Sequence, residues 1–488
     1  MTLRFAFARS SFVALHTVAL AALLTSTGCS SKDSEGKNTH PEKDGGGGGG
    51  QPGDSGPTVD NRCHPTASLA AKRNTCDFGP GAAPEDTIGD CPGDAIPIEH
   101  VVLIMQENRS FDQYFGHFKG HGQDDVDVPA APPTNPAGAV GDAGASGTVT
   151  WHHEDKWCQP DTDHGWVASH QQWNGGQMDG FATSNAVVAD PTGGRALGYY
   201  EEADLPFYYQ LYSTFATSDR YFCSLLGPTY PNRLFFLAGT SFGATRTDLS
   251  AVAPKGAPFI LRQLDEKGVT WKVYKTNLPS VLLFADYATD SKLADHFVQA
   301  EQFAVDAAAG TLPQVSIVDA NYSDKAWLET DEHPPADAQL GQHWVWQQVQ
   351  ALVKGPQWND AALFITYDEH GGLYDHVEPP PACAPDDIAP KERPDLGGFD
   401  RLGFRVPVVV VSPYAKRHFV SHEVHSHTSI LRFVQTKFGL SALTNRDANS
   451  DAMLDFFDFD HAPNLDVPDF AEPAVDQAAL DDCKAAFP

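Results

Sequence analysis

Three uninterrupted apolar runs along the chain have the length and composition of buried strands. They are "HVVLIMQEN" at 100–108, "AALFITYDEHGG" at 361–372 and "FRVPVVVVSPYA" at 404–415. Such runs are typical of the interior of a largely parallel sheet that helices cover on both faces. The segments 341–355 and 426–440 between and after them have helical patterns. Strands that alternate with helices predict an α/β fold, a three-layer sandwich around a largely parallel central sheet.

The N-terminal 29 residues have a different pattern. Two early arginines precede an apolar run that is too short to span a bilayer, and small residues follow it up to Cys29. This order predicts an export signal. The position of Cys29 resembles a bacterial lipoprotein signal, in which the cysteine is lipidated, although Ser26 stands where that pattern prefers leucine. We therefore expect a cell-envelope lipoprotein, with simple secretion as the alternative.

Residues 30–60 are polar and contain a run of six glycines. A segment of this composition cannot bury enough apolar surface to fold, so it predicts a disordered tether. No second linker as marked as this one follows, and residues 61–488 are predicted to form a single domain.

Seven cysteines follow Cys29, and an exported protein with an odd number can form up to three disulfides with one free thiol. Cys223 is the predicted free thiol, because it lies in the apolar stretch "YFCSLLG". No Cys/His spacing typical of a zinc site occurs.

The formal net charge of −31 excludes the basic footprint that nucleic-acid binding requires. It also disfavours adhesion to anionic lipid surfaces, so we expect contact with a membrane only through the lipid anchor. An acidic surface that keeps an exported protein in solution accounts for most of this charge.

Polar residues follow two of the buried runs directly: Glu107 and Asn108 after the first, Asp368 and Glu369 after the second. Ligands in open α/β sheets bind beyond the carboxyl ends of strands. If these strands are neighbours, three carboxylates would repel one another unless a cation lies among them. Oxygen ligands favour one divalent ion such as Ca²⁺, Mg²⁺ or Mn²⁺. The alternative, for any one of these acids alone, is a helix cap or a surface charge.

Thr229 lies in "GPTYPNR", where Gly227, Pro228 and Pro231 predict a rigid turn before a helix that starts near Asn232. A hydroxyl at a helix start lies close to backbone N–H groups that favour an anion. Coordination to a metal would make this hydroxyl a nucleophile. Without a metal, a capping threonine is the simpler interpretation.

The chain resembles the bacterial phosphoesterases that include non-zinc phospholipases C and an acid phosphatase, distant relatives of alkaline phosphatase and the sulfatases. The resemblance spans about 98–445 and depends on six motifs in the family's order: "ENRSFDQYFG" at 107–116, "HGWVASHQQWNGGQMDGF" at 164–181, "GPTYPNR" at 227–233, "EHPP" at 332–335, "YDEHGGLYDHV" at 367–377 and "HTSILRF" at 427–433. It implies an alkaline-phosphatase-like fold and a phosphoesterase catalytic domain.

The same resemblance implies roles for individual residues. The metal ligands would be Glu107, Asn108, Thr229, Asp368 and Glu369. Thr229 would also be the nucleophile.

His164 and His333 match histidines near the phosphate, while His370, His376 and His427 are expected to have structural roles. Arg109 is expected to brace the turn, with Ser110 and Asp112, rather than bind phosphate.

The implied reaction is hydrolysis of a phosphoester through a phosphothreonine. A phosphatidylcholine-type phospholipid is the preferred substrate, and a phosphomonoester is the alternative, as for an acid phosphatase. A non-catalytic surface lipoprotein is a third possibility, but it would be expected to have lost Thr229 or an acidic ligand, and all five positions are present.

Overall fold

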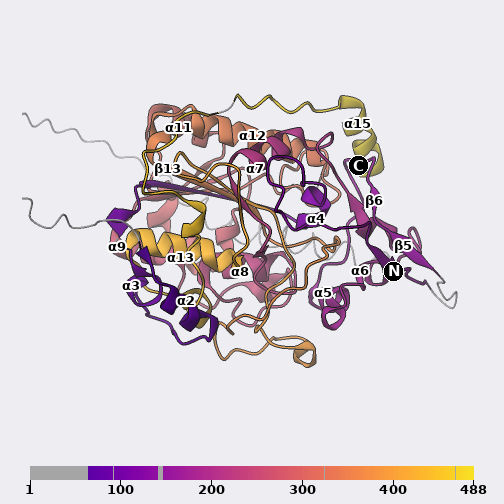
Figure 1. Ribbon diagram of the computed structural model, residues 1–488, viewed down its shortest axis with the longest axis horizontal. Helices are drawn as coiled ribbons and strands as arrows, with labels where there is room; N and C mark the ends of the chain where they lie inside the picture. The colour runs from indigo at the N-terminus through magenta and orange to yellow at the C-terminus, as the bar shows by residue number, and fades with distance from the viewer. Residues whose placement is uncertain (1–63, 92, 141–146, 324, 468) are drawn as a thin grey trace, which may run out of the picture.

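A mostly parallel eight-stranded sheet runs through the middle of the protein, in a computed structural model that describes residues 64–91, 93–140, 147–323, 325–467 and 469–488 (Figure 1). The predicted export signal and tether lie outside these residues. The strand order is β11-β10-β12-β3-β13-β14-β8-β15. The strands are β3 (His100–Gln106), β8 (Ala216–Ser218), β10 (Trp271–Lys275), β11 (Phe297–Gln299), β12 (Val315–Val318), β13 (Ala361–Tyr367), β14 (Val408–Val411) and β15 (Phe419–Ser421).

The three predicted strands are adjacent in this sheet. β3 and β13 are parallel neighbours, whereas β14 is antiparallel to both β13 and β8. The prediction of a largely parallel sheet is confirmed. The apolar run at 404–415 nevertheless forms an antiparallel strand, because a strand covered on both faces is apolar whichever way it runs.

Helices cover both faces of the sheet, as the sandwich prediction requires. Figure 1 shows α7 (Pro206–Thr214), α11 (Gln302–Ala309) and α12 (Ala338–Val353) on one side of it, and α8 (Thr229–Ala238), α9 (Ile260–Lys267) and α13 (His427–Phe438) on the other. α12 and α13 correspond to the two predicted helical patterns. Asp337 caps α12 by accepting a hydrogen bond from the Gln339 N–H, and Gly439, with φ +60°, ends α13.

Shorter elements lie around this sandwich. The helices are α2 (Ala67–Asn74), α3 (Pro84–Thr87), α4 (Phe111–Phe115), α5 (Trp166–Trp173), α6 (Phe181–Ser184), α10 (Ala285–Ala288), α14 (Asn445–Ala448) and α15 (Gln477–Ala486). The two-stranded ribbons pair β1 (His64–Pro65) with β2 (Gly89–Asp90), β4 (Thr134–Pro136) with β5 (Thr148–Thr150), β6 (His152–His153) with β7 (Gly198–Tyr199), and β9 (Tyr221–Phe222) with β16 (His425–Ser426). Among the described residues, no helix is both long and apolar enough to cross a membrane.

Disulfides join distant parts of the chain. Cys76 bonds to Cys383 and Cys158 bonds to Cys483, and Cys91 is also disulfide-bonded. Cys223 is a buried free thiol, as predicted. Disulfides are typical of proteins from an oxidising compartment, which agrees with export.

A buried ion-pair network ties α4 to the segment after β13. Arg405 donates to Asp112 at 2.8 Å and to Asp375 at 2.9 Å, and all three side chains are fully buried. The His376 ring Nδ1 lies 2.6 Å from Asp112, and its Nε2 lies 3.3 Å from Asp127. The structure thus gives Asp112 the expected bracing role and places His376 in the same network.

This network predicts a pH-dependent stability. Burial lowers the pKa of His376, but the hydrogen bond and charge of Asp112, helped by Asp375 and opposed by Arg405, raise it above 6.5. The imidazolium therefore stabilises the fold fully below the unfolded pKa of 6.5, and this contribution is lost as the pH rises through the folded pKa. We expect His376→Asn to cost about 1 kcal/mol at pH 6 and less at pH 9. Urea titrations at both pH values measure this difference, and an equal cost at the two would contradict it.

Candidate functional site

Four of the five predicted metal ligands lie together at the carboxyl ends of β3 and β13. Gln106 pairs with Tyr367 at the last position of the two parallel strands, so Glu107 and Asn108 lie beside Asp368 and Glu369. All four side chains are buried. The prediction that the two strands are neighbours is confirmed.

A sharp turn at Asn108 makes this arrangement possible. Its φ of +60° is in the left-handed region, where asparagine is better tolerated than most residues. Its N–H donates to Asp368 Oδ1 at 3.1 Å. A Cβ at Gly371 would lie 2.4 Å from the Asn108 carbonyl oxygen, so this close approach requires glycine.

The three carboxylates at this edge are held in an environment that opposes their charge. Burial raises the pKa of Glu107 and raises that of Glu369 well above its usual range. Burial also raises the pKa of Asp368, to about 6, although the charge of Arg233 opposes the shift. Such a group of acids requires compensating positive charge.

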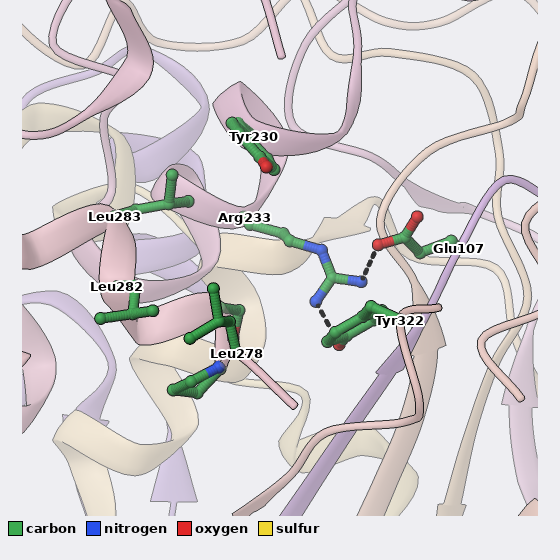
Figure 2. A pocket seen from close by; sticks show the side chains of 9 residues that line it. Glu107, Tyr230, Arg233, Leu278, Leu282, Leu283 and Tyr322 are labelled. Carbon is green, nitrogen blue, oxygen red and sulfur yellow. Dashed lines mark hydrogen bonds and ion pairs between the residues drawn. The ribbon is translucent and has the colours of Figure 1, made fainter. Parts of the chain in front are cut away.

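Arg233 supplies part of that charge, and sequence reasoning missed it. Its guanidinium donates to Asp368 Oδ2 at 3.2 Å, to Glu107 Oε1 at 3.1 Å and to the Tyr322 hydroxyl at 3.0 Å. Figure 2 shows this side chain reaching from α8 between Glu107 and Tyr322. The signal in the sequence was an arginine four residues after Thr229, which is one helical turn away and on the same face.

Thr229 is the first residue of α8, so the helix begins three residues earlier than predicted. Pro231 therefore lies inside the first turn, where a missing N–H costs no intrahelical hydrogen bond. The Thr229 side chain is buried and shares a face of α8 with Arg233, which contacts two of the carboxylates. The start of α8 therefore lies near the strand ends, and the role of Thr229 stays a prediction.

His164 connects the segment before α5 to the two strand ends. Its Nε2 lies 3.2 Å from Asn108 Nδ2 and 3.6 Å from Glu369 Oε1, and its Nδ1 lies 2.7 Å from the Thr162 carbonyl oxygen. Burial lowers its pKa, but the negative charges of Glu369 and Asp161 outweigh this effect and raise it to about 9. A protonated His164 can hold an anionic oxygen or donate a proton.

His333 lies next to His164, with 5.7 Å between the ring centroids. Its backbone N–H donates to Asp331 Oδ1 at 3.0 Å. His164, His333 and Asp161 also form one of the side-chain groups that could hold a metal ion. The structure thus brings the two predicted catalytic histidines together, and it adds Asp161, which the motif analysis did not single out.

Glu332, directly before His333, is a second residue that sequence reasoning missed. Its side chain is fully buried and its φ is +71°. Tyr114 donates to Glu332 Oε2 at 2.5 Å, Tyr367 donates to it at 2.9 Å, and Tyr208 donates to Oε1. Three hydroxyls on one carboxylate stabilise a left-handed backbone conformation that a glutamate rarely adopts.

Arg109 connects the segment at Glu332 to the turn at Asn108. It is buried and donates to the Glu332 carbonyl oxygen from Nε at 3.0 Å and from Nη2 at 2.6 Å. The expectation that Arg109 braces the turn is confirmed. Because Arg109 follows Asn108 and Glu332 precedes His333, one contact fixes both segments relative to each other.

We expect Glu332→Gln to lower kcat by about tenfold while the bound metal stays unchanged, because the effect passes through the position of His333. In a His333→Ala background the same substitution should have no further effect on kcat. Steady-state kinetics of the two single variants and the double variant test this. Tyr208→Phe is a milder change, because it removes one of the three hydroxyls that donate to Glu332. Additive losses would contradict the coupling.

Two further histidines make structural contacts next to the site. His427 is buried, and its Nε2 lies 2.7 Å from the Asp368 carbonyl oxygen, while burial lowers its pKa to about 4. His370 is buried against Gln172, with 2.7 Å between Nε2 and Oε1. Both positions agree with the structural roles expected for them.

The donor set fits a divalent cation. Asn108 Oδ1 and Glu369 Oε1 are buried oxygens without a hydrogen-bond partner within the described part of the chain. Unsatisfied oxygens beside carboxylates with raised pKa values are what a hard cation would satisfy. These two oxygens support a divalent cation here, and the ligand set stays a prediction. Among the described residues, the acids and histidines that lie close enough together to share an ion at this site are Asp161, His164 and His333.

Residues 98–441 match the sequence profile of the phosphoesterase family. The chain belongs to this family. Phospholipase C B of Mycobacterium tuberculosis is 34% identical over 439 residues, covering 79% of this chain and 82% of that protein. Non-specific phospholipase C6 of Arabidopsis thaliana is 32% identical over 392 residues, covering 76% and 74%.

The member described here is a phosphoric ester hydrolase that resembles phospholipase C. Solved structures were also compared. The lipoteichoic acid synthase LtaP from Listeria monocytogenes gives a TM-score of 0.38 at 10% identity, covering 78% of this chain and 82% of that chain. A protein in the alkaline phosphatase superfamily from Vibrio parahaemolyticus gives 0.32 at 10% identity, covering 69% and 76%.

Proposed function

We propose that this phosphoesterase is a metal-dependent phosphodiesterase that hydrolyses phosphatidylcholine-type phospholipids through a phosphothreonine intermediate. The observation that supports it is the position of Thr229 at the start of α8, one turn before an arginine bonded to Glu107 and Asp368. A threonine and helix N–H groups at the start of α8, with a buried acidic cluster contacted by the same helix, support this proposal. The names of the phospholipase C relatives support the substrate class.

A divalent cation bound by Glu107, Asn108, Asp368 and Glu369 would supply Lewis acidity, lowering the pKa of the Thr229 hydroxyl and neutralising charge on the phosphoryl group. The chain's own residues supply the attacking oxygen, the positive charge near the phosphoryl oxygens and the proton for the leaving group. The Thr229 oxygen attacks phosphorus in line with the ester oxygen that leaves, and the P–O bond to the leaving alcohol breaks.

His164, held between Asn108 and Glu369, stabilises the phosphoryl oxygens with its positive charge. A protonated histidine of the His164–His333 pair donates a proton to the departing oxygen. The histidine that has given up its proton takes one from the water that attacks phosphorus, the bond to Thr229 breaks, and the threonine oxygen regains from solvent the proton it lost before its own attack.

The test is hydrolysis of p-nitrophenylphosphorylcholine and p-nitrophenyl phosphate side by side, with and without chelator. We expect faster turnover of the choline diester and loss of both activities after chelation, with recovery on adding Ca²⁺, Mg²⁺ or Mn²⁺. Preference for the monoester would assign an acid phosphatase instead. Full activity in chelator would contradict the metal dependence.

A further inference from the structure

A histidine and two aspartates come together on segments that the proposed reaction does not use. His425 begins β16, and Asp451 and Asp455 lie in the segment after α14. Each of the three side chains offers one possible ligand atom, and these atoms lie within 4.8 Å of one another. Acidic groups often lie close together without an ion, so the hydrogen bonds of this cluster have to show whether any of its atoms lacks a partner.

The ring of His425 has one nitrogen without a hydrogen-bond partner. The residue is only 1% exposed. Its Nε2 lies 3.1 Å from Ser421 Oγ, and because that hydroxyl donates to Asp455 Oδ2, it accepts from the Nε2–H. Nδ1 has no hydrogen-bond partner among the described residues, and the 3.7 Å to Asp451 Oδ1 is too long for a hydrogen bond. A buried polar atom in this state is costly unless something binds it.

Both aspartates keep an oxygen that an ion could use. Asp455 Oδ1 lies 3.4 Å from the ring Nε2 and has no hydrogen-bond partner within the described part of the chain. Asp451 Oδ2 pairs with Arg73 at 2.9 Å, and Oδ1 accepts from the Met453 N–H at 2.7 Å, which leaves it a lone pair. Ligands of a four-coordinate zinc ion, with bonds of about 2.0–2.1 Å, lie roughly 3.3–3.4 Å apart. The separation of His425 Nδ1 from Asp451 Oδ1 is close to this value.

We propose that His425, Asp451 and Asp455 bind a Zn²⁺ ion, with water in the remaining position. One imidazole nitrogen and two carboxylate oxygens suit Zn²⁺, whereas Ca²⁺ and Mg²⁺ prefer oxygen ligands alone. The set contains no cysteine, so the Cys/His spacing typical of zinc sites does not reveal it in the sequence.

The ion would have a structural role at the start of α13. It joins His425, two residues before His427, to the segment that contains Asp451 and Asp455. His427 Nε2 lies 2.7 Å from the Asp368 carbonyl oxygen. The zinc site would therefore fix the end of α13 that contacts a predicted ligand of the catalytic metal.

The zinc content of the purified protein tests this proposal. After dialysis against ZnCl₂ with Ca²⁺ in large excess, elemental analysis should find about one more zinc ion per chain in the wild type than in Asp455→Asn or Asp451→Asn. Both aspartates are partly exposed, and circular dichroism checks that the variants fold. Asp458→Asn is the matched control, because Asp458 is an aspartate 2.8 Å from the exposed His461, and it should keep the zinc content of the wild type.

Anomalous scattering from zinc-soaked crystals of the wild type locates the ion without any substitution. We expect a zinc peak within bonding distance, about 2.0–2.2 Å, of His425 Nδ1 and of both carboxylates. Equal zinc content in the wild type, Asp455→Asn and Asp451→Asn would overturn the proposal, and so would a map with zinc at the strand ends alone or with none at His425. Neither measurement uses hydrolysis, so the result is independent of the proposed function.

Discussion

Replacement of Thr229 with alanine should lower kcat/KM for p-nitrophenylphosphorylcholine by at least about 10⁴-fold, because the variant has no oxygen to attack phosphorus. Thr229 is also a predicted metal ligand, but four others remain, so we expect the variant to keep most of its metal. Stopped assays at high enzyme concentration measure the residual rate, and elemental analysis measures the metal.

Matched variants separate the nucleophile from a merely structural threonine. Thr229→Ser keeps a hydroxyl at the start of α8 and should retain at least a tenth of the activity, a loss of at most about 1.4 kcal/mol in transition-state stabilisation. Thr183→Ala, at an exposed threonine, should have wild-type kinetics. After a rapid quench, the wild type and Thr229→Ser should carry phosphate on the chain, and Thr229→Ala should not. A Thr229→Ala variant with near wild-type turnover would remove Thr229 from the mechanism.

Much of the sheet could be predicted from the sequence, and so could the part of the site formed by the residues that follow β3 and β13. β3 and β13 are apolar on both faces, and polar residues follow each strand directly, so their juxtaposition depends only on the two strands being neighbours. The buried Cys223 was predictable for a similar reason, because its neighbours are apolar. These features depend on local composition, which a single sequence displays.

Other features depend on contacts between distant segments. The direction of β14 follows from its connections, since an apolar run has no polarity that marks it as antiparallel. Glu332 resembled part of a short polar motif, yet its three tyrosine partners come from α4, α7 and β13. A carboxylate that is stabilised by hydroxyls from three elements cannot be distinguished in the sequence from a solvated one.

Arg233 is the feature with the largest predicted effect on stability. Its side chain is almost fully buried, and it forms ion pairs with Glu107 and Asp368, which are also buried. Removal of one partner from a buried pair leaves an uncompensated charge and typically costs about 3–5 kcal/mol. We expect Arg233→Met to lose this much free energy of unfolding in chelator, because two carboxylates would lose their cationic neighbour. Urea titrations of the wild type and the variant measure the loss.

Added metal should distinguish this role from simple loss of packing. A divalent cation that binds the acidic cluster stabilises only the folded state, so it should restore part of the stability of Arg233→Met by mass action. Arg246→Met, which removes an exposed arginine 2.7 Å from Asp248, should cost less than about 1 kcal/mol with or without metal. A cost for Arg233→Met as small as that of Arg246→Met would mean that the carboxylates at the strand ends do not depend on this guanidinium. Their charge would then have to be balanced by the cation and His164 alone.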